Sequence, residues 1–480
     1  MKRIYLLTIF LLARLSFAGG QVTFNKHYEE INGKGRSVLQ TNDGGYIVAG
    51  EKSNGPHVKD MFLLKTDQYG ETIWLKHFGS DAYEAAYSIL ESSDGGYIIA
   101  GYTSYLPFTT LEDIYLVKTN ANGDFIGEKI YGGSQREIAY SIGNTSNNGY
   151  IISGFTDSYG SGSHDVYLLR TDGLGDTLWT KTFGGTKKDE GFSVLETTDG
   201  GFLVAGYTES FGAGGKDFYL IKTNSSGNTS WTKVYGGISD ELAYIVKQTN
   251  DGGYIATGYT ESYGAGTQNI YIIKINDTGD TLWTKVHGQP GRYCVAYDIN
   301  QTNDGGYIIS GMITTASPNG DSDLYVLKIN STGGFTWDRE FKIEPTNTVQ
   351  TASRGHSIQQ TIDGGYIIAG YWFSGIKFEL LMVKTKENGT VGIKEKSSLH
   401  NNYNIYPNPI SNTATLEFNN PKREEHTLTI FDIQGRLVNI RTDIKTEQIK
   451  INKSGLPRGL YLIQLRSENH IRFIGKLMIE

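Results

Sequence analysis

Four acidic residues occupy the same place in four consecutive segments of the chain: Glu84, Glu137, Asp189 and Glu241. Each stands three residues before an aromatic residue in a short apolar stretch. Carboxylates that converge in this way would attract a cation such as Ca²⁺, or would accept hydrogen bonds from sugar hydroxyl groups. A structural interpretation is also open, in which each carboxylate accepts hydrogen bonds from backbone N–H groups of an adjacent loop. The four acids are therefore candidate ligand-binding residues, and their role depends on the elements that position their side chains.

These acids belong to a sequence repeat. The tetrapeptide Asp-Gly-Gly-Tyr, or a close variant, recurs at intervals of 51 to 59 residues. Its seven copies begin at Asp43, Asp94, Asn147, Asp199, Asp251, Asp304 and Asp363. A nearly constant period of this size indicates a propeller, a solenoid or another repeat array. Each unit predicts four short strands, with the Asp-Gly-Gly turn between the first two, a variable loop before the third, and a second Gly turn before a last, aromatic strand.

Four antiparallel strands per repeat are typical of one blade of a β-propeller. The seventh unit lacks an aromatic fourth strand, because residues 385–392 follow its third strand instead. Residues 23–28 near the N-terminus match the fourth strand at 73–78 position for position. An N-terminal strand that completes the last blade would close the ring and remove its open edges. The sequence therefore predicts an all-β, seven-bladed propeller over residues 19–392.

Residues that recur in most units are expected to be structural. Tryptophan recurs in the fourth strand, where it would pack between neighbouring blades: Trp74, Trp179, Trp231, Trp283 and Trp337. The loops between the second and third strands differ from unit to unit, as in residues 102–112, 207–216 and 312–322. Binding residues tend to lie on such loops above a rigid scaffold. The face that carries these loops, and the four acids, is the predicted binding surface.

Composition and charge exclude several classes of protein. The 61 glycines and 32 tyrosines among 480 residues fit many short strands and tight turns. The single cysteine, Cys294, excludes an intrachain disulfide and a Cys-based zinc site. The net charge of −7 disfavours nucleic-acid binding. Residues 401–480 carry 11 basic and 8 acidic side chains and residues 1–18 carry three basic ones, which leaves −13 for residues 19–400.

The N-terminus predicts an export signal. Lys2 and Arg3 precede the apolar stretch 4–13, and Ser16 and Ala18 are the small residues that a signal peptidase reads before Gly19. The apolar stretch is too short to span a bilayer, and no other segment holds 18 continuous apolar residues. We expect residues 1–18 to be a signal peptide, and the mature chain to contain no membrane-spanning segment.

The repeat stops after residue 392. Residues 393–402 form a polar linker, and residues 403–480 alternate apolar and polar side chains between Pro, Asn and Gly turns, which predicts a small β-sandwich. This region contains four motifs in order: Tyr-Pro-Asn-Pro at 406–409, Asp-x-x-Gly-Arg at 432–436, Leu-Pro-x-Gly-x-Tyr at 456–461 and Lys-Leu-x-Ile at 476–479.

The ordered motifs resemble the C-terminal sorting domain of proteins exported by the type IX secretion system. The resemblance assigns the sorting signal to nine residues: Pro407, Asn408, Pro409, Asp432, Gly435, Arg436, Gly459, Tyr461 and Lys476. It implies periplasmic transit, recognition by the type IX machinery, and transport to the cell surface or the medium. The propeller repeats resemble a widespread group of secreted bacterial propellers, which implies no single activity.

The sequence identifies no catalytic residue. The nine histidines are scattered, and there is no His-Glu-x-x-His or Gly-x-Ser-x-Gly motif. We expect a non-enzymatic protein that binds a glycan or a protein through its variable-loop face, with no cofactor other than Ca²⁺ at the four acids. The alternative is a secreted polysaccharide hydrolase or lyase with acids such as Glu84 and Glu137 at the mouth of the channel.

Overall fold

The computed structural model describes residues 21–480 except 56–57, 80–82, 105–110, 266, 315–320, 343–350, 392–402, 419, 421–422, 433–435, 454, 468–469 and 480. The chain forms two compact units, residues 1–392 and 393–480. The predicted signal peptide, the predicted linker and the tips of two predicted variable loops, 105–110 and 315–320, lie outside the described residues. Within the described ranges, no helix is long and apolar enough to cross a membrane.

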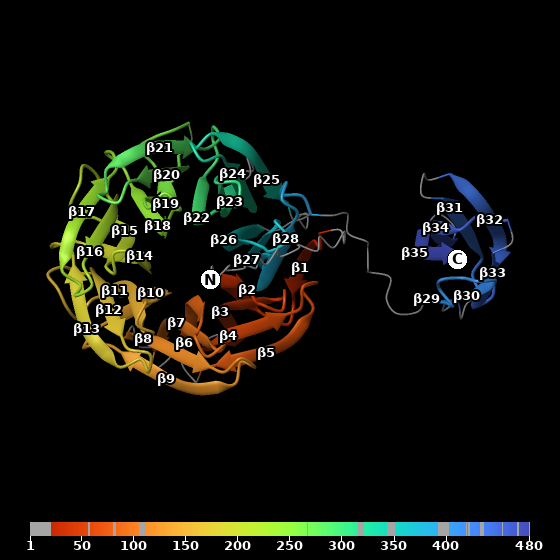
Figure 1. Ribbon diagram of the computed structural model, residues 1–480, viewed down its shortest axis with the longest axis horizontal. Helices are drawn as coiled ribbons and strands as arrows, with labels where there is room; N and C mark the ends of the chain where they lie inside the picture. The colour runs from red at the N-terminus through yellow and green to blue at the C-terminus, as the bar shows by residue number, and fades with distance from the viewer. Residues whose placement is uncertain are drawn as a thin grey trace, which may run out of the picture. The chain divides into compact units, whose positions relative to one another are not determined.

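The first unit is a ring of seven blades, each made of four strands that pair antiparallel in spatial order (Figure 1). The innermost strands are β2 (Gly33–Gln40), β6 (Tyr83–Glu91), β10 (Glu137–Asn144), β14 (Asp189–Glu196), β18 (Glu241–Gln248), β22 (Cys294–Gln301) and β26 (Ala352–Gln360). The second strands are β3 (Tyr46–Gly55), β7 (Tyr97–Ser104), β11 (Tyr150–Thr156), β15 (Phe202–Thr208), β19 (Tyr254–Thr260), β23 (Tyr307–Thr314) and β27 (Tyr366–Phe373).

The third strands are β4 (Val58–Thr66), β8 (Glu112–Thr119), β12 (Asp165–Thr171), β16 (Asp217–Thr223), β20 (Asn269–Ile275), β24 (Ser322–Ile329) and β28 (Phe378–Thr385). The outermost strands are β5 (Thr72–Phe78), β9 (Phe125–Tyr131), β13 (Thr177–Phe183), β17 (Thr229–Tyr235), β21 (Thr281–His287), β25 (Phe335–Phe341) and β1 (Phe24–Tyr28). Blade 1 is β2–β5, and the blades are numbered along the chain to blade 7, which is β26–β28 with β1.

The ring closes through the N-terminal strand. β1 pairs antiparallel with β28, with Phe24 opposite Lys384 and Tyr28 opposite Leu380. Trp74 stands opposite Lys65 in the same way in blade 1, so β1 takes the place of a fourth strand in blade 7. The predicted seven-bladed propeller and its closure are confirmed.

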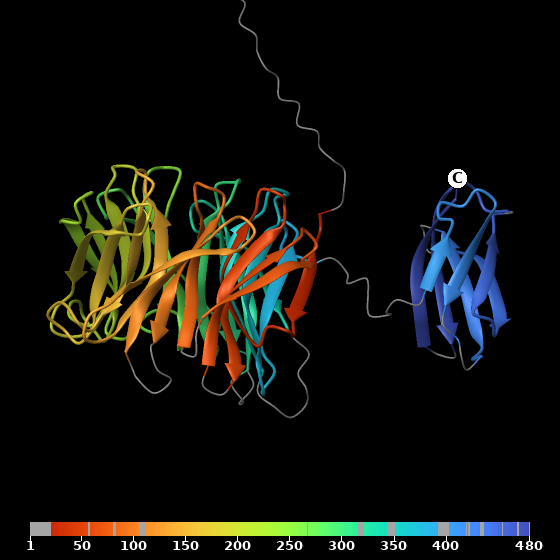
Figure 2. The same ribbon diagram turned by 90° about the horizontal axis from the view of Figure 1, so that it is seen from below.

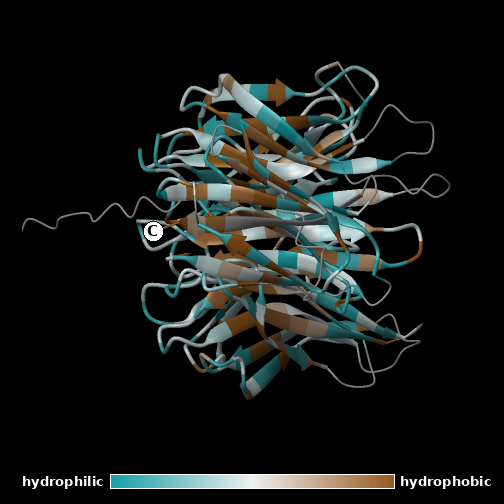
Figure 3. Cartoon of the chain, turned by 90° about the vertical axis from the view of Figure 1, so that its right-hand side faces the viewer, coloured by the Kyte–Doolittle hydropathy of each residue, from teal (hydrophilic) through white to brown (hydrophobic). Residues whose placement is uncertain are grey.

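The apolar core lies between the blades. The second and third strands are buried along most of their length, as in β11 and β12, because neighbouring blades cover both of their faces. Such strands are expected to be continuously apolar, and hydrophobic segments run through the strands in Figure 3. Each apolar cluster of the propeller joins two adjacent blades, for example Ile47 and Leu63 of blade 1 with Ile99 and Tyr115 of blade 2. The blades are therefore held together by side-chain packing across their faces.

The Asp-Gly-Gly turns lie on one face of the ring, which Figure 2 shows edge-on. In blade 1, Gly44 has a φ of +82°, a conformation that favours glycine. Asp43 accepts a hydrogen bond from the backbone N–H of Gly45 at 2.9 Å and pairs with Lys65 of the third strand at 2.8 Å. The repeated Asp and Lys therefore tie the first turn to the third strand, which explains their recurrence.

The second unit consists of two small sheets. One contains β29 (Tyr403–Tyr406), β30 (Thr413–Phe418) and β33 (Gln448–Asn452), and the other contains β32 (Leu437–Ile444), β31 (His426–Asp432), β34 (Gly459–Ser467) and β35 (His470–Ile479). Their inner faces share one apolar cluster that includes Leu416, Ile430 and Ile463. This is the predicted β-sandwich.

Candidate functional site

Every innermost strand contains a β-bulge at the same position. The pairing of β10 with β11, for example, passes from Ala139 to Ser141 and leaves Tyr140 without a cross-strand partner. Because a bulge re-aims the extra side chain, the bulged residues line the central cavity, whose volume is about 360 Å³. They are Arg36, Tyr87, Tyr140, Phe192, Tyr244, Tyr297 and His356. We call this set the lumen ring.

Neighbouring members of the lumen ring contact each other around the whole circle. Successive ring centroids from Tyr87 to His356 are 4.8–5.4 Å apart. Arg36 closes the circle, with its guanidinium 5.2 Å from the Tyr87 ring and 3.3 Å from Nε2 of His356. Burial, together with Arg36, Arg354 and Lys34, holds the pKa of His356 well below its usual range, so its ring is neutral and Nε2 accepts the hydrogen bond from Arg36.

A second layer of polar side chains ties adjacent blades together next to the bulges. Ser141 accepts a hydrogen bond from the backbone N–H of Val194 at 3.2 Å, and Ser193 accepts one from Val246 at 3.2 Å. In blade 6 the place of serine is taken by Asp298, whose Oδ2 accepts the N–H of Ile358 at 2.9 Å. Burial raises the pKa of Asp298. This layer satisfies backbone groups next to the bulges, so its role is structural.

The mouth of the channel on the variable-loop face is asymmetric, and its basic side lies at blades 7 and 1. Glu51 is contacted by three cations: Arg36 at 2.9 Å, Lys59 at 3.2 Å and Lys34 at 3.5 Å. These cations hold the pKa of Glu51 at about 2, against the effect of its burial. The carboxylate is therefore ionised, and these four groups together carry a charge of +2.

Arg354 of blade 7 adds a further positive charge to this side of the mouth. Its Nη1 donates a hydrogen bond to the hydroxyl of Tyr297 at 3.2 Å, and its guanidinium lies 5.8 Å from the Tyr371 ring. Its Nε is buried without a hydrogen-bond partner in the described part of the chain. We call Lys34, Arg36, Glu51, Lys59 and Arg354 the basic mouth cluster, whose formal charge is +3.

The opposite side of the mouth, at blades 3 and 4, is internally paired. His164 lies between Glu190, 2.8 Å from its Nδ1, and Arg136, 2.9 Å from its Nε2. Oδ1 of Asp157 also lies 3.4 Å from Nε2, so the imidazole contacts two carboxylates and a guanidinium. The ring stacks on Phe155 with centroids 4.4 Å apart, and Arg136 also pairs with Asp157 at 2.9 Å. This network has few donors left for a ligand.

The four candidate acids lie at the starts of β6, β10, β14 and β18, and their side chains point away from solvent. Their exposed fractions are 2% for Glu84 and 0% for Glu137, Asp189 and Glu241. Glu137 accepts hydrogen bonds from the N–H groups of Gly133 at 2.7 Å and Ser158 at 3.2 Å. Glu241 makes the same contacts one blade further on, with Gly237 at 2.6 Å and Ser262 at 3.1 Å.

Asp189 follows the same pattern, and Glu84 shares its contact with a threonine hydroxyl. Asp189 accepts hydrogen bonds from the N–H of Gly185 at 2.8 Å and from the Ser210 hydroxyl at 2.6 Å, and Glu84 accepts one from the Thr103 hydroxyl at 3.2 Å. The backbone contacts of Glu137, Asp189 and Glu241 are those of the structural interpretation, in which an acid accepts hydrogen bonds from an adjacent loop. Within the described ranges no group of three or more His, Cys, Asp or Glu could hold a metal ion. The ligand, Ca²⁺ and catalytic roles of the four acids remain predictions. None of the four side chains is exposed to solvent, so the structure adds no support for these roles.

Sequence reasoning missed the lumen ring and the basic mouth cluster. The aromatic position of the ring was visible in the repeat, because it follows the acid by three residues. The bulge that turns it into the lumen was not, since a bulge depends on cross-strand register. The clearest available signal was that blades 1 and 7 carry Arg36 and His356 where blades 2–6 carry Tyr or Phe.

The predicted sorting residues lie mainly at the turns and strand ends of the second unit. Asn408 accepts a hydrogen bond from the N–H of Met478 at 2.9 Å, and Asp432 accepts one from Nε of Arg436 at 2.7 Å. The hydroxyl of Tyr461 donates to the carbonyl of Pro457 at 2.8 Å. Gly435 lies outside the described residues, as does the side chain of Lys476. The motifs thus help to hold the turns of the sandwich.

Comparison with known proteins identifies the second unit. Residues 404–480 match the family described as "Secretion system C-terminal sorting domain". No curated protein matches the chain. The fold and this domain together define an exported β-propeller protein. More particularly, the protein is a cargo of the type IX secretion system, which carries it across the outer membrane to the cell surface or the medium.

Several solved structures are similar to the chain. The lectin BP39L from Burkholderia pseudomallei has 9% identity and a TM-score of 0.44, over 77% of this chain and 97% of that one. YCF48 bound to D1 peptide has 10% identity and a TM-score of 0.42, over 77% and 97%. The extracellular domain of the hybrid two component system BT3049 from B. thetaiotaomicron has 11% identity and a TM-score of 0.43. That match covers 95% of this chain and 57% of that one.

Proposed function

We propose that the protein is an exported binding module that holds an acidic glycan, one that carries carboxylate or sulfate groups, at the basic mouth cluster. The observation that supports this proposal is a local excess of positive charge. The basic mouth cluster carries a formal charge of +3, whereas residues 19–400 as a whole carry −13. Three cations surround one carboxylate, and Arg354 forms no ion pair with any residue that the structure describes. An anionic ligand would supply the missing negative charge.

The rigid scaffold supports this assignment of the site. The bulges fix the positions of Arg36 and His356, and contacts with neighbouring members of the lumen ring hold them from both sides. Lys34 lies 4.2 Å from the Phe378 ring, which orients its ammonium group, while 22% of its side chain stays exposed. Burial and the neighbouring cations lower the pKa of Lys34, and a bound anion would oppose this effect. Such a preformed site loses little entropy when it binds.

Salt-dependent binding tests the proposal. Biolayer interferometry would compare polygalacturonate and a sulfated polysaccharide with neutral dextran, each at 20 and 500 mM NaCl. Ion pairs at a partly exposed site are screened by salt. We therefore expect the acidic glycans to bind at low salt, to lose roughly tenfold or more in affinity at high salt, and to bind better than dextran.

Charge variants give the matched control. The double variant Lys34→Gln/Arg354→Gln removes two cations from the mouth and should weaken binding about tenfold. Lys76→Gln/Lys233→Gln removes two cations of the outermost strands, where they pair with Asp124 and Asp280, and should leave binding unchanged. The proposal fails if both double variants bind alike, if dextran binds equally well, or if only an acidic protein competes for the site.

A further inference from the structure

The interfaces between blades contain a repeated aromatic contact near the outer rim. In six of the seven outermost strands an aromatic residue, Trp in five and Phe in β1, packs against the turn glycine that precedes the outermost strand of the next blade. A methyl group added at Gly227, for example, would lie 2.8 Å from the Trp179 ring. The ring and glycine pairs are Phe24 with Gly70, Trp74 with Gly123, Trp179 with Gly227, Trp231 with Gly279, Trp283 with Gly333, and Trp337 with Gly389.

Blade 2 breaks this pattern, because Gly127 stands where the tryptophan should be. Gly127 lies opposite Lys118, as Trp74 lies opposite Lys65 and Trp231 opposite Lys222. A Cβ atom added at Gly127 would meet no atom within 4 Å. The interface of blades 2 and 3 therefore contains an open slot that the aromatic ring fills at the other six interfaces.

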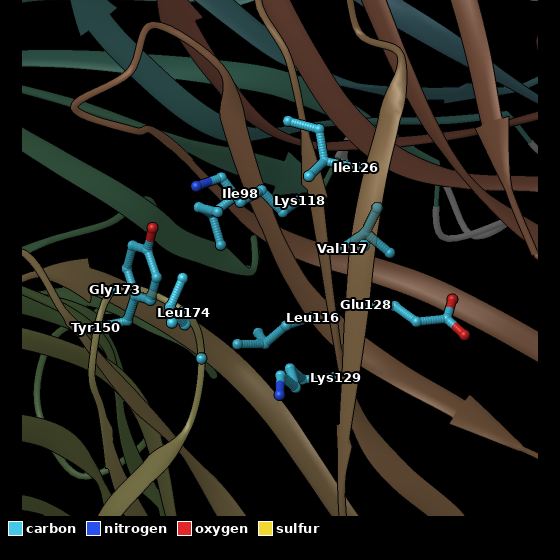
Figure 4. A pocket seen from close by; sticks show the side chains of 12 residues that line it. Ile98, Leu116, Val117, Lys118, Ile126, Glu128, Lys129, Tyr150, Gly173 and Leu174 are labelled. Atoms are coloured by element: carbon cyan, nitrogen blue, oxygen red, sulfur yellow. The ribbon is translucent and has the colours of Figure 1, made fainter.

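This slot is a cavity of about 210 Å³. Ile98, Leu116 and Ile126 of blade 2 line it together with Tyr150 and Leu174 of blade 3, and Figure 4 shows Tyr150 and Leu174 facing Leu116 and Ile126. An engineered apolar cavity of about 150 Å³ is large enough to bind benzene. The slot is therefore large enough for an aromatic ring, and its repeated geometry is that of an indole site.

Two further features depart from the repeat at the same place. The side chain of Lys118 is 30% exposed, whereas the equivalent Lys65, Lys222, Lys274, Lys328 and Lys384 are 1–8% exposed beneath their rings. Leu174, on the turn beside the slot, is 77% exposed. The equivalent turn positions hold Tyr69, Asn122, Ser226, Thr278, Thr332 and Asn388. This turn position thus holds an exposed leucine only at the interface that lacks the tryptophan, and it holds a mostly polar residue in the other blades.

We propose that the slot between blades 2 and 3 is a receptor for a tryptophan side chain of a partner protein. The partner's indole would take the position that the chain's own tryptophan occupies between the other blades, against Tyr150 and the turn at Gly175. Ile126, 55% exposed, and Leu174 would contact the backbone and neighbouring side chains of the partner segment. These apolar margins extend beyond the slot itself, which favours a peptide over a free aromatic compound. The site is independent of the basic mouth cluster.

The tripeptide acetyl-Gly-(5-fluoro-Trp)-Gly-amide serves as the probe, with binding to the purified protein followed by ¹⁹F NMR line broadening. Gly127→Trp restores the repeat and fills the slot from within. We expect the tripeptide to bind the wild type and to lose at least tenfold in affinity for Gly127→Trp. The melting temperature of this variant should be higher than that of the wild type, which shows that the new ring has entered the slot.

Trp231→Gly gives the complementary variant, since it opens the equivalent slot between blades 4 and 5. If this variant folds, it should bind two equivalents of the tripeptide, whereas the wild type should bind one. The proposal is overturned if the tripeptide fails to bind the wild type, or if it binds wild type and a stabilised Gly127→Trp equally. It is also overturned if free 5-fluoroindole binds but the tripeptide does not, because the occupant would then be a small molecule.

Discussion

The interfaces of blades 2 and 3 and of blades 4 and 5 are built from the same repeat, yet only the second contains the tryptophan of the outermost strand. Between blades 4 and 5, Trp231 covers Lys222 and packs on Gly279. Between blades 2 and 3, Gly127 leaves the equivalent Lys118 open to water. Repeated residues therefore maintain the architecture, and departures from the repeat mark the places where the surface is available to a ligand.

The channel mouth supports the same conclusion. Blades 2 to 6 place Tyr or Phe in the lumen ring, whereas blades 1 and 7 place Arg36 and His356 there. Arg36 belongs to the basic mouth cluster, and His356 accepts a hydrogen bond from it. By contrast, the four candidate acids recur in consecutive blades, and three of them, Glu137, Asp189 and Glu241, accept hydrogen bonds from the backbone of adjacent loops.

The largest expected effect comes from making blade 4 resemble blade 2. Trp231→Gly removes a partly buried indole and leaves a cavity, so the free energy of unfolding should fall by about 3 kcal/mol. Urea denaturation followed by circular dichroism measures the change. Leu282→Ala, which removes an exposed apolar side chain in the next blade, is the control and should cost less than about 0.5 kcal/mol. If Trp231→Gly lowered the free energy of unfolding as little as the control does, the repeated tryptophan would not stabilise the interface between blades.

The next effect concerns the repeated ion pair. Asp199→Asn leaves the ammonium of Lys222, whose side chain is 4% exposed, without its carboxylate, and should cost about 2 kcal/mol. Asp94→Asn removes the equivalent partner of Lys118, whose side chain is 30% exposed and solvated, and should cost less than about 1 kcal/mol. Denaturant midpoints of the two variants provide the test. Equal losses would show that the open slot does not expose the blade 2 pair.

Gly127→Trp makes blade 2 resemble the other blades. Burial of the indole in the existing slot should raise the free energy of unfolding by about 1–2 kcal/mol. The position has space for a Cβ atom and its φ is not positive. Differential scanning calorimetry measures the shift against Gly143→Trp, since β10 offers no such slot. Destabilisation by Gly127→Trp would mean that the slot is not shaped for an indole.

The smallest effect is the dependence of stability on pH. The pKa of Asp199 is about 2 in the folded protein, because Lys222, Thr197 and the N–H of Gly201 stabilise its charged form. A folded pKa below the unfolded value of about 3.9 stabilises the fold above that value. This contribution should be lost as the pH falls from about 4 to about 2. Melting temperatures between pH 5 and pH 2.5 should fall less for Asp199→Asn than for the wild type, and parallel curves would refute this.

Much of the fold could be predicted because it repeats. The spacing of Asp43 and its six equivalents predicted seven blades, and the match of residues 23–28 to 73–78 predicted the closing strand. The packing of Trp74 and its equivalents between blades was also predictable, since a large aromatic residue after a Gly turn has few other places to go.

The proposed binding sites were less predictable, because they depend on the cross-strand register of the bulges and on the absence of a tryptophan at one position of the repeat. Glu137 has the residue type of a ligand-binding acid, but only the structure shows that Gly133 and Ser158 already use its carboxylate. Gly127 is an unremarkable residue in a strand until the repeat is aligned in space and the empty position appears. The one-residue bulge at Arg36 likewise follows from cross-strand pairing, which residue type alone does not determine.

The hydrogen-exchange footprint of polygalacturonate on the protein at low salt measures directly where an acidic glycan binds. We expect slower exchange at the starts of β2, β4 and β26, where the basic mouth cluster lies, and no change at the Asp-Gly-Gly turns on the opposite face. The protection should disappear in Lys34→Gln/Arg354→Gln. Protection confined to the Asp-Gly-Gly turns or to the sorting domain would contradict the claim that departures from the repeat form the binding surface.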